Sequence, residues 1–180
     1  MINKIKMLQS ILDTPVYAVG GCVRDYVMNK IPHDYDFTSV LKPQKVIDIC
    51  NFRNVKIIDV GGSKFGTVII LPNDSEKYEI TTFRKDFNQD GRKTDVEYAD
   101  SIEDDLSRRD FSINSLAMDS RGNIIDLFGG INDIKKFRMI RCVGNPYERF
   151  QEDYLRIIRA CRFSSKFGFF FEKYTMLAAK

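Results

Sequence analysis

The sequence has no long apolar run, so no segment approaches the length of a membrane-spanning helix, and its N-terminus lacks the apolar region of a signal peptide. It also has no paired cysteine spacing, because its four cysteines stand at positions 22, 50, 142 and 161. That pattern argues against a zinc site and against a secreted disulfide scaffold. We therefore expect a cytoplasmic protein with buried, reduced thiols and no membrane partner.

Charge is unevenly distributed along the chain. The hydrophobic share of 43% and the charged share of 29% are those of an ordinary globular protein. The formal net charge is +3, yet residues 141–180 carry eight Lys or Arg and only four Asp or Glu. A basic segment beside a carboxylate-bearing remainder is typical of proteins that handle polyanions.

A glycine pair lies between a short strand and a short helix, predicted at residues 16–19 and 22–28. Gly20 and Gly21 let the backbone approach an anion, and the free N–H groups of the first helical turn point toward it. Arg24 adds a guanidinium suited to phosphate oxygens. We predict a phosphate-binding turn here, although a glycine pair before a helix is more often only a turn.

Two carboxylates follow this turn. Asp34 and Asp36 alternate with Tyr35 and Phe37, and residues two apart in a strand share a face. The two carboxylates would therefore project together while the two rings pack on the other side. Hard oxygen ligands in that arrangement suit Mg²⁺, which would hold a nucleotide triphosphate. The alternative is the solvated edge of a strand.

A third carboxylate lies in the middle of a later strand, predicted at residues 77–84. Glu79 is a candidate metal ligand, or the group that receives the proton of an attacking hydroxyl. The alternative is a charge on the solvent face of an edge strand.

A polar segment at residues 85–101 shows little periodicity and predicts a mobile loop. It precedes Arg108, Arg109 and Asp110, and Asp110 is placed to cap a short helix at residues 111–116. An arginine pair with an aspartate is commonly a surface ion pair. The alternative is that these residues contact a substrate, because they lie between a predicted loop and an apolar run.

The chain changes character at Gly144. Up to residue 143 it mixes strands, helices and short connections, which indicates one α/β domain. A helix cap at Asn145 then predicts one long helix that ends at Gly168, with an apolar stripe formed by Tyr154, Leu155, Ile158 and Cys161. A further apolar, helical segment is expected from residue 169.

One row of this helix carries charge. Asp153 and Arg156 are three residues apart and so are neighbours, and Arg159 and Arg162 continue the row. An aspartate accepts and an arginine donates hydrogen bonds, so a rigid Asp153/Arg156 pair is able to mimic the edge of a template base. The alternative is a solvated face with one ion pair.

Taken together, these motifs resemble those of the tRNA nucleotidyltransferase (CCA-adding enzyme) and bacterial poly(A) polymerase family, class II of the polymerase-β-like nucleotidyltransferases. The resemblance covers about residues 16–168. It implies an α/β (α+β) head with a mixed sheet flanked by helices at residues 1–143. The start of an all-helical, nucleotide-selecting neck would follow at residues 144–180. Relatives continue into body and tail domains that grip tRNA, so the chain is expected to stop inside the neck.

The resemblance also implies a role for individual residues. Catalysis is implied for Asp34, Asp36 and Glu79, of which the two aspartates would bind Mg²⁺. Nucleotide binding is implied for Gly20, Gly21, Arg24, Arg109, Asp110, Asp153, Arg156, Arg159 and Arg162.

The implied activity is template-independent addition of C and A to the 3′ end of tRNA, or of another RNA, from CTP and ATP with release of pyrophosphate. An A-adding enzyme, a poly(A) polymerase and a catalytically silent nucleotide- or RNA-binding module remain alternatives. The segment at residues 85–101 favours a CCA- or A-adding enzyme, because relatives that add only cytidine tend to lack it. The sequence leaves the oligomeric state open.

Overall fold

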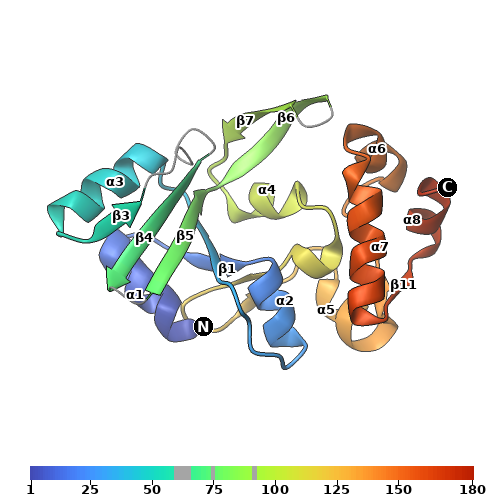
Figure 1. Cartoon of the computed structure of the whole chain (residues 1–180), viewed down its shortest axis with the longest axis horizontal. Coiled ribbons are helices and arrows are strands. Elements are labelled where there is room, and N and C mark those ends of the chain that lie inside the picture. The colour runs from blue at the N-terminus through green and yellow to red at the C-terminus, as the bar shows by residue number, and fades with distance from the viewer. Residues whose placement is uncertain (59–65, 74–75, 91–92) are drawn as a thin grey trace.

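The computed structural model describes the backbone of residues 1–58, 66–73, 76–90 and 93–180, and the side chains there except those of residues 86–90 and 93–96. A seven-stranded sheet in the order β3-β4-β5-β2-β1-β8-β9 lies at its centre (Figure 1). The strands are β1 (Tyr17–Val19), β2 (Asp36–Ser39), β3 (Lys56–Ile58), β4 (Thr67–Asn73), β5 (Glu76–Thr82), β8 (Ala117–Met118) and β9 (Ile124–Ile125). All neighbouring pairs are antiparallel except β2 and β5. The predicted mixed sheet with flanking helices is confirmed.

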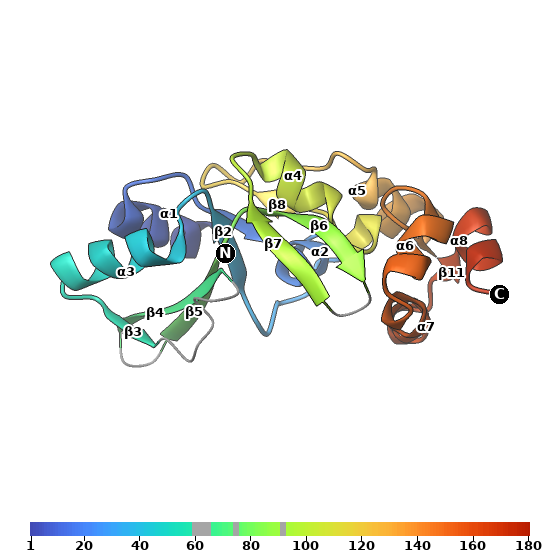
Figure 2. The same ribbon diagram turned by 90° about the horizontal axis from the view of Figure 1, so that it is seen from above.

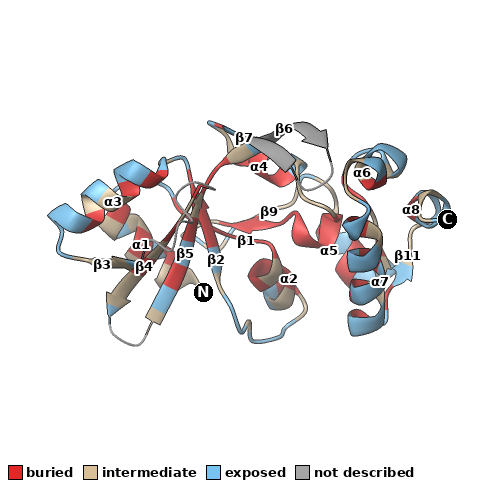
Figure 3. Cartoon of the chain, turned by 45° about the horizontal axis from the view of Figure 1, so that its top comes forward, coloured by how far each residue is buried: buried red, intermediate tan, exposed pale blue. Residues whose placement is uncertain are grey.

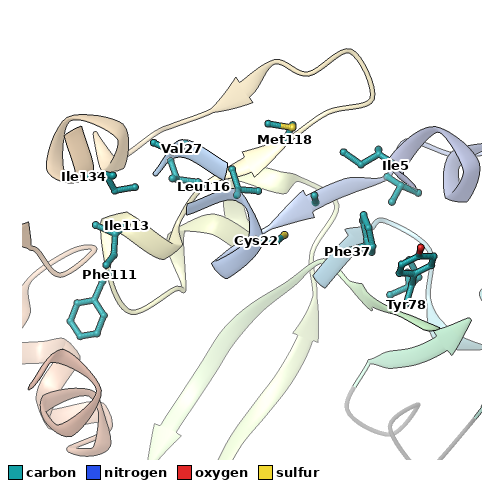
Figure 4. Packing of buried hydrophobic residues seen from close by; sticks show 14 of the residues in the cluster. Ile5, Cys22, Val27, Phe37, Tyr78, Phe111, Ile113, Leu116, Met118 and Ile134 are labelled. Atoms are coloured by element: carbon teal, nitrogen blue, oxygen red, sulfur yellow. The ribbon is translucent and has the colours of Figure 1, made fainter. Parts of the chain in front are cut away.

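One face of the sheet is covered by the helices α1 (Ile2–Leu12), α2 (Gly21–Val27) and α3 (Pro43–Phe52). Their apolar side chains, among them Ile5, Val27 and Val46, form one buried cluster with Phe37 and Tyr78 of the sheet (Figure 4). Burial of this face stabilises the sheet, because the free energy gained is roughly proportional to the apolar area removed from water.

Side chains on the central strands alternate between the two faces. Ala18 belongs to the helix-covered cluster, whereas Val19 belongs to a second cluster with Leu106 of α4 (Ile102–Ser107). Val19 pairs with Asp36, and Asp36 pairs in turn with Glu79. Paired residues project to the same face, so both carboxylates lie on the α4 side of the sheet.

The prediction of a loop at residues 85–101 is wrong. The strands β6 (Arg84–Asp90) and β7 (Lys93–Tyr98) form a separate antiparallel ribbon, and residues 91 and 92 lie outside the described residues. Strands pair through their backbones, so a polar segment is able to pair without an alternating apolar pattern. The Asp90-Gly91 dipeptide, which generally marks a turn, was the available signal in the sequence.

The single long helix predicted after Asn145 is also wrong. It is divided into α6 (Pro146–Glu152) and α7 (Leu155–Phe167), and the two meet at Asp153, whose backbone is extended with φ −153° and ψ 103°. The Asp153 carboxylate accepts the Leu155 N–H at 2.9 Å. An aspartate that binds the backbone in this way competes with continuation of the helix. The predicted ends are confirmed, since Asn145 caps α6 and Gly168, with φ 66°, ends α7.

Short elements complete the chain. They are a 3₁₀ turn at Ser112–Asn114 in place of the predicted helix, α5 (Gly130–Asn132), a π turn at Asp133–Phe137, β10 (Met139–Ile140), β11 (Phe170–Phe171) and α8 (Lys173–Ala178). β11 pairs in parallel with β10, so the helix expected directly from residue 169 begins only after a strand. Figure 2 shows α6, α7 and α8 together at one end of the molecule.

The outer surface of α7 is largely exposed (Figure 3). The predicted apolar stripe lies there, with Ile158 at 65% exposure, while Ala160 and Phe163 on the inner side are buried. Cys161 is exposed, so the expectation of buried thiols holds only for the other three cysteines. None of the helices in the described ranges has the length and apolar character that crossing a membrane requires.

The junction between the sheet domain and α7 provides a test of stability. Phe111 is fully buried and packs edge-on against Phe163, with ring centroids 5.9 Å apart. Phe111→Ala should lower the free energy of unfolding by about 3–5 kcal/mol through lost burial and the cavity that remains. Urea unfolding measures this loss. Phe52→Ala, at a position that is 88% exposed, is the control and should change stability by less than about 0.5 kcal/mol. A loss below about 1 kcal/mol for Phe111→Ala would contradict the packing.

Candidate functional site

A cleft of about 520 Å³ lies between the α4-side face of the sheet and the inner side of α7. Among the described residues that line it, seven are arginines, one is a lysine and three are aspartates. Such an excess of positive charge in a concave surface attracts anions. The cleft brings together ten of the predicted site residues: Gly20, Gly21, Arg24, Asp36, Arg109, Asp110, Asp153, Arg156, Arg159 and Arg162. Asp34 and Glu79 are not among its lining residues.

The glycine turn forms one edge of the cleft. Gly20 has φ 70° and ψ −126°, which favours glycine, and a Cβ atom there would lie only 2.8 Å from Nη1 of Arg109. The missing side chain thus lets a guanidinium lie directly against the backbone. Gly20 also closes the first turn of α2, since its carbonyl accepts the Arg24 N–H at 3.0 Å.

A chain of hydrogen bonds crosses the floor of the cleft. Buried Arg24 donates to Asn114 Oδ1 at 2.6 Å, and Asn114 Nδ2 donates to Asp110 Oδ1 at 3.2 Å. The other oxygen of Asp110 accepts from Arg159 Nε of α7 at 2.7 Å. The Arg24 guanidinium also lies 4.6 Å from the centre of the Phe167 ring. The network therefore joins α2, the 3₁₀ turn and α7. Sequence reasoning missed Asn114, although its spacing of four residues from Asp110 is one at which side chains meet on a helical turn.

Of the three predicted carboxylates, Asp36 and Glu79 lie on strands and Asp34 does not. β2 begins at Asp36, so Asp34 lies in the bend before it, and the expectation that both aspartates stand on a strand is wrong. Asp36 and Glu79 are register partners on the parallel strands β2 and β5. Tyr35 and Phe37 stack with ring centroids 6.4 Å apart, as expected for side chains on the opposite face.

Electrostatics at Asp36 favour a bound cation. Loss of hydration raises the pKa of the Asp36 carboxyl, the positive charge of Arg109 opposes this, and the negative charge of Asp34 raises the pKa further. Two mutually repelling carboxylates are a donor set suited to a hard divalent cation. Within the described part of the chain, no group of three or more His, Cys, Asp or Glu side chains comes together to hold a metal. A cation at Asp36 would therefore draw its other ligands from water or from a substrate, as Mg²⁺ commonly does.

Across the cleft, Arg156 is buried and forms an ion pair with Glu152. It also donates to the Arg149 carbonyl at 2.7 Å, and the Arg149 guanidinium donates to the carbonyls of Arg108 and Arg109. Arg156 is thus held by Glu152 and the Arg149 carbonyl, whereas the predicted helical row that starts at Asp153 is broken because Asp153 lies outside α7. Sequence reasoning missed the role of Arg149, since the two carbonyls that it binds belong to residues about forty positions earlier in the chain.

The fold and the cleft define a head domain of the polymerase-β-like nucleotidyltransferase type. A family model described as the poly A polymerase head domain matches residues 16–141. The chain therefore belongs to the poly(A) polymerase head-domain family, as its motifs predict.

Curated relatives extend well beyond this chain. It is 47% identical over 164 residues to the CCA-adding enzyme of Enterococcus faecalis, an alignment that covers 90% of this chain and 39% of that enzyme. A second CCA-adding enzyme, from Oceanobacillus iheyensis, is 48% identical over 154 residues, which are 84% of this chain and 37% of that enzyme. The chain thus spans about two fifths of the length of these relatives.

The fold is similar to that of a solved Bacillus stearothermophilus CCA-adding enzyme in complex with CTP. The TM-score is 0.84 and the identity is 40%, over 98% of this chain and 41% of that chain. A tRNA nucleotidyltransferase complexed with a primer tRNA and an incoming ATP analog is also similar. Its TM-score is 0.76 at 28% identity, over 99% of this chain and 48% of that one.

Removal of the Asp36 charge tests the electrostatics of the site. Because the folded state raises the pKa of Asp36, its ionised form costs the folded protein free energy above that pKa. Without divalent cations, Asp36→Asn should therefore be more stable than the wild type at pH 7. The gain should shrink as the pH falls through the folded-state pKa and vanish below the unfolded-state value of about 4.

Urea unfolding of both proteins across this pH range measures the gain. Asp48→Asn, on an exposed surface of α3, is the control and should stay within about 0.5 kcal/mol of the wild type. Destabilisation by Asp36→Asn at pH 7 would contradict the assignment.

Proposed function

We propose that this chain is the head and the start of the neck of an enzyme that adds C and A to the 3′ end of tRNA from CTP and ATP. The observation that carries the proposal is the cleft, in which the Asp36 carboxylate faces a glycine turn and an excess of arginines. It is supported by CCA-adding relatives at 47% and 48% identity. No observation favours a poly(A) polymerase or a silent binding module over this activity.

The basic residues that line the cleft bind the nucleotide. Gly20 and Gly21 bring the backbone close to the triphosphate, and Arg24 and Arg109 neutralise its charge. Asp110 receives the ribose hydroxyls. Positioning and charge neutralisation account for most of the catalysis of phosphoryl transfer, so these groups lower the barrier by holding the α-phosphate in line with the RNA hydroxyl.

The carboxylates of Asp34, Asp36 and Glu79 take part in the nucleotidyl transfer itself. Asp34 and Asp36 would hold Mg²⁺, which when bound lowers the pKa of the attacking hydroxyl and stabilises the leaving pyrophosphate. Glu79, next to Asp36 in register, is the acceptor for the proton of the RNA 3′-hydroxyl. The oxygen then bonds to the α-phosphorus as the bond to the β-phosphate oxygen breaks.

Residues of α7 and of the bend before it, at Asp153, select the nucleotide. Arg156 is held by Glu152 and lines the cleft beside Asp153, so a guanidinium and a carboxylate stand together at the bend. Together they read the base edge of CTP or ATP, while Arg159 and Arg162 meet the triphosphate. This division assigns residues 1–143 to a catalytic head and residues 144–180 to a nucleotide-selecting neck.

Loss of either metal-binding carboxylate should abolish transfer. Asp34→Ala and Asp36→Ala should each slow addition to labelled tRNA by at least about 100-fold, because several kcal/mol of transition-state stabilisation come from the ion. The assay supplies tRNAs ending before C, before the second C and before A, with one nucleotide at a time. Circular dichroism checks the fold, and Asp48→Asn is the matched control. Near-normal extension by either variant would refute the metal assignment, and a wild type that adds only A would favour the A-adding alternative.

Selectivity tests the template role of Asp153, and two substitutions separate it from the role in capping α7. Asparagine retains a cap acceptor and turns the second oxygen into a donor, whereas alanine removes both. Both variants should lower discrimination of CTP over UTP by about tenfold, the equivalent of one hydrogen bond. Only Asp153→Ala should also lose thermal stability. Unchanged discrimination in Asp153→Asn would remove Asp153 from the template.

A further inference from the structure

Asp105 is a buried carboxylate that the predicted site does not include. It lies on α4, directly behind the cleft, and has no exposed surface. A buried ionised carboxylate is costly unless it is paired. Here burial by itself would raise the pKa of Asp105, but the charges and hydrogen bonds of Arg109 and Arg108 outweigh it and hold this pKa below its ordinary value.

The two oxygens of Asp105 are divided between two arginines. Oδ1 accepts from Arg108 Nε at 3.0 Å, and Oδ2 accepts from Arg109 Nη2 at 2.9 Å. The two arginines line the cleft, whereas Asp105 does not. The start of α4 is fixed by Ser101, whose hydroxyl accepts the Asp104 N–H, so the carboxylate is presented from a capped helix.

Arg109 stands between two negative groups. One end of its guanidinium is held by Asp105, while Nη1 lies against Gly20 at the turn. Its positive charge also acts on Asp36, whose pKa it lowers. Nε of Arg109 is buried and meets no hydrogen-bond partner within the described residues. Arg109 and Asp36 line the same cleft, so a guanidinium released by Asp105 would have the Asp36 carboxylate as an alternative counter-ion.

We propose that Asp105 is a positioning residue that holds the Arg109 guanidinium at the glycine turn and keeps it off Asp36 and Asp34. This inference rests on the proposed function, in which those aspartates hold a divalent cation. A free arginine and a divalent cation would compete for the same carboxylates, so the ion pair behind the cleft keeps the metal position open. The same ion pair aims Arg109 at the triphosphate.

The central variant is Asp105→Asn, which retains the shape and one acceptor but removes the charge. Arg109 should then turn to Asp36. Affinity for Mn²⁺, used as a spectroscopic substitute for Mg²⁺ and measured by electron paramagnetic resonance without RNA, should fall by about 10- to 100-fold, as for other groups that orient a metal site. The KM for CTP should rise, while the KM for tRNA stays unchanged.

A second variant tests the competition itself. Asp105→Asn/Arg109→Gln removes the released arginine, so Mn²⁺ affinity should return to the wild-type level while CTP binding stays weak. A residue needed only for folding would show no such rescue. Arg109→Gln alone retains the buried carboxylate, with Arg108 still paired to it, and should bind Mn²⁺ at least as tightly as the wild type. Comparison of Arg109→Gln with the wild type tests the competition between Arg109 and the cation even if Asp105→Asn fails to fold. Glu103→Gln, on the exposed side of α4, is the control and should leave Mn²⁺ binding unchanged.

Three results would overturn the proposal. They are unchanged Mn²⁺ affinity in folded Asp105→Asn, no recovery in the double variant, and weaker Mn²⁺ binding in Arg109→Gln alone. A wild type that binds neither Mn²⁺ nor CTP would refute the proposed function, and this inference with it. Wild-type binding with an unaffected Asp105→Asn would refute the positioning role alone.

Discussion

The pairing of β2 with its two neighbours is the constraint on which the site depends. Val19, Asp36 and Glu79 stand side by side across three strands, so they share one face. The opposite face is occupied by α1, α2 and α3, and Phe37 is buried there. A shift of one residue in the register of β2 would turn the Asp36 side chain into that core and the Phe37 side chain toward the α4 side of the sheet. The same packing that stabilises the sheet therefore fixes which face carries charge.

The arginines near the glycine turn of the cleft are paired with acidic or amide side chains rather than isolated. Each arginine for which a partner is described near the turn is bound by an acid or an amide: Arg24 by Asp25 and Asn114, and Arg109 by Asp105. The surplus of positive charge in the cleft is thus held by a rigid frame, which makes it preorganised to bind an anion.

Much of this arrangement was predictable from local patterns. The glycine turn, the cap at Asn145 and the helix end at Gly168 each have a local cause, and the structure confirms all of them. Features that depend on distant or competing partners were not predictable. The break at Asp153 results from one side chain that binds a backbone N–H, and the ribbon at β6 and β7 forms through backbone pairing in a polar segment. Asp105 gives no signal in the sequence, because an aspartate in the first turn of a helix is ordinary there.

The stacking of Arg24 on Phe167 has a consequence for where the protein divides. Arg24 belongs to α2 and reaches the glycine turn, while Phe167 belongs to α7, so one contact joins a helix on the sheet to a helix near the end of the chain. The family model ends at residue 141, before α7 begins. A fragment cut at that border would retain both acids of the sheet yet lack an entire wall of the cleft. The cleft therefore exists only where the sheet and α7 are present together, because residues of both line it.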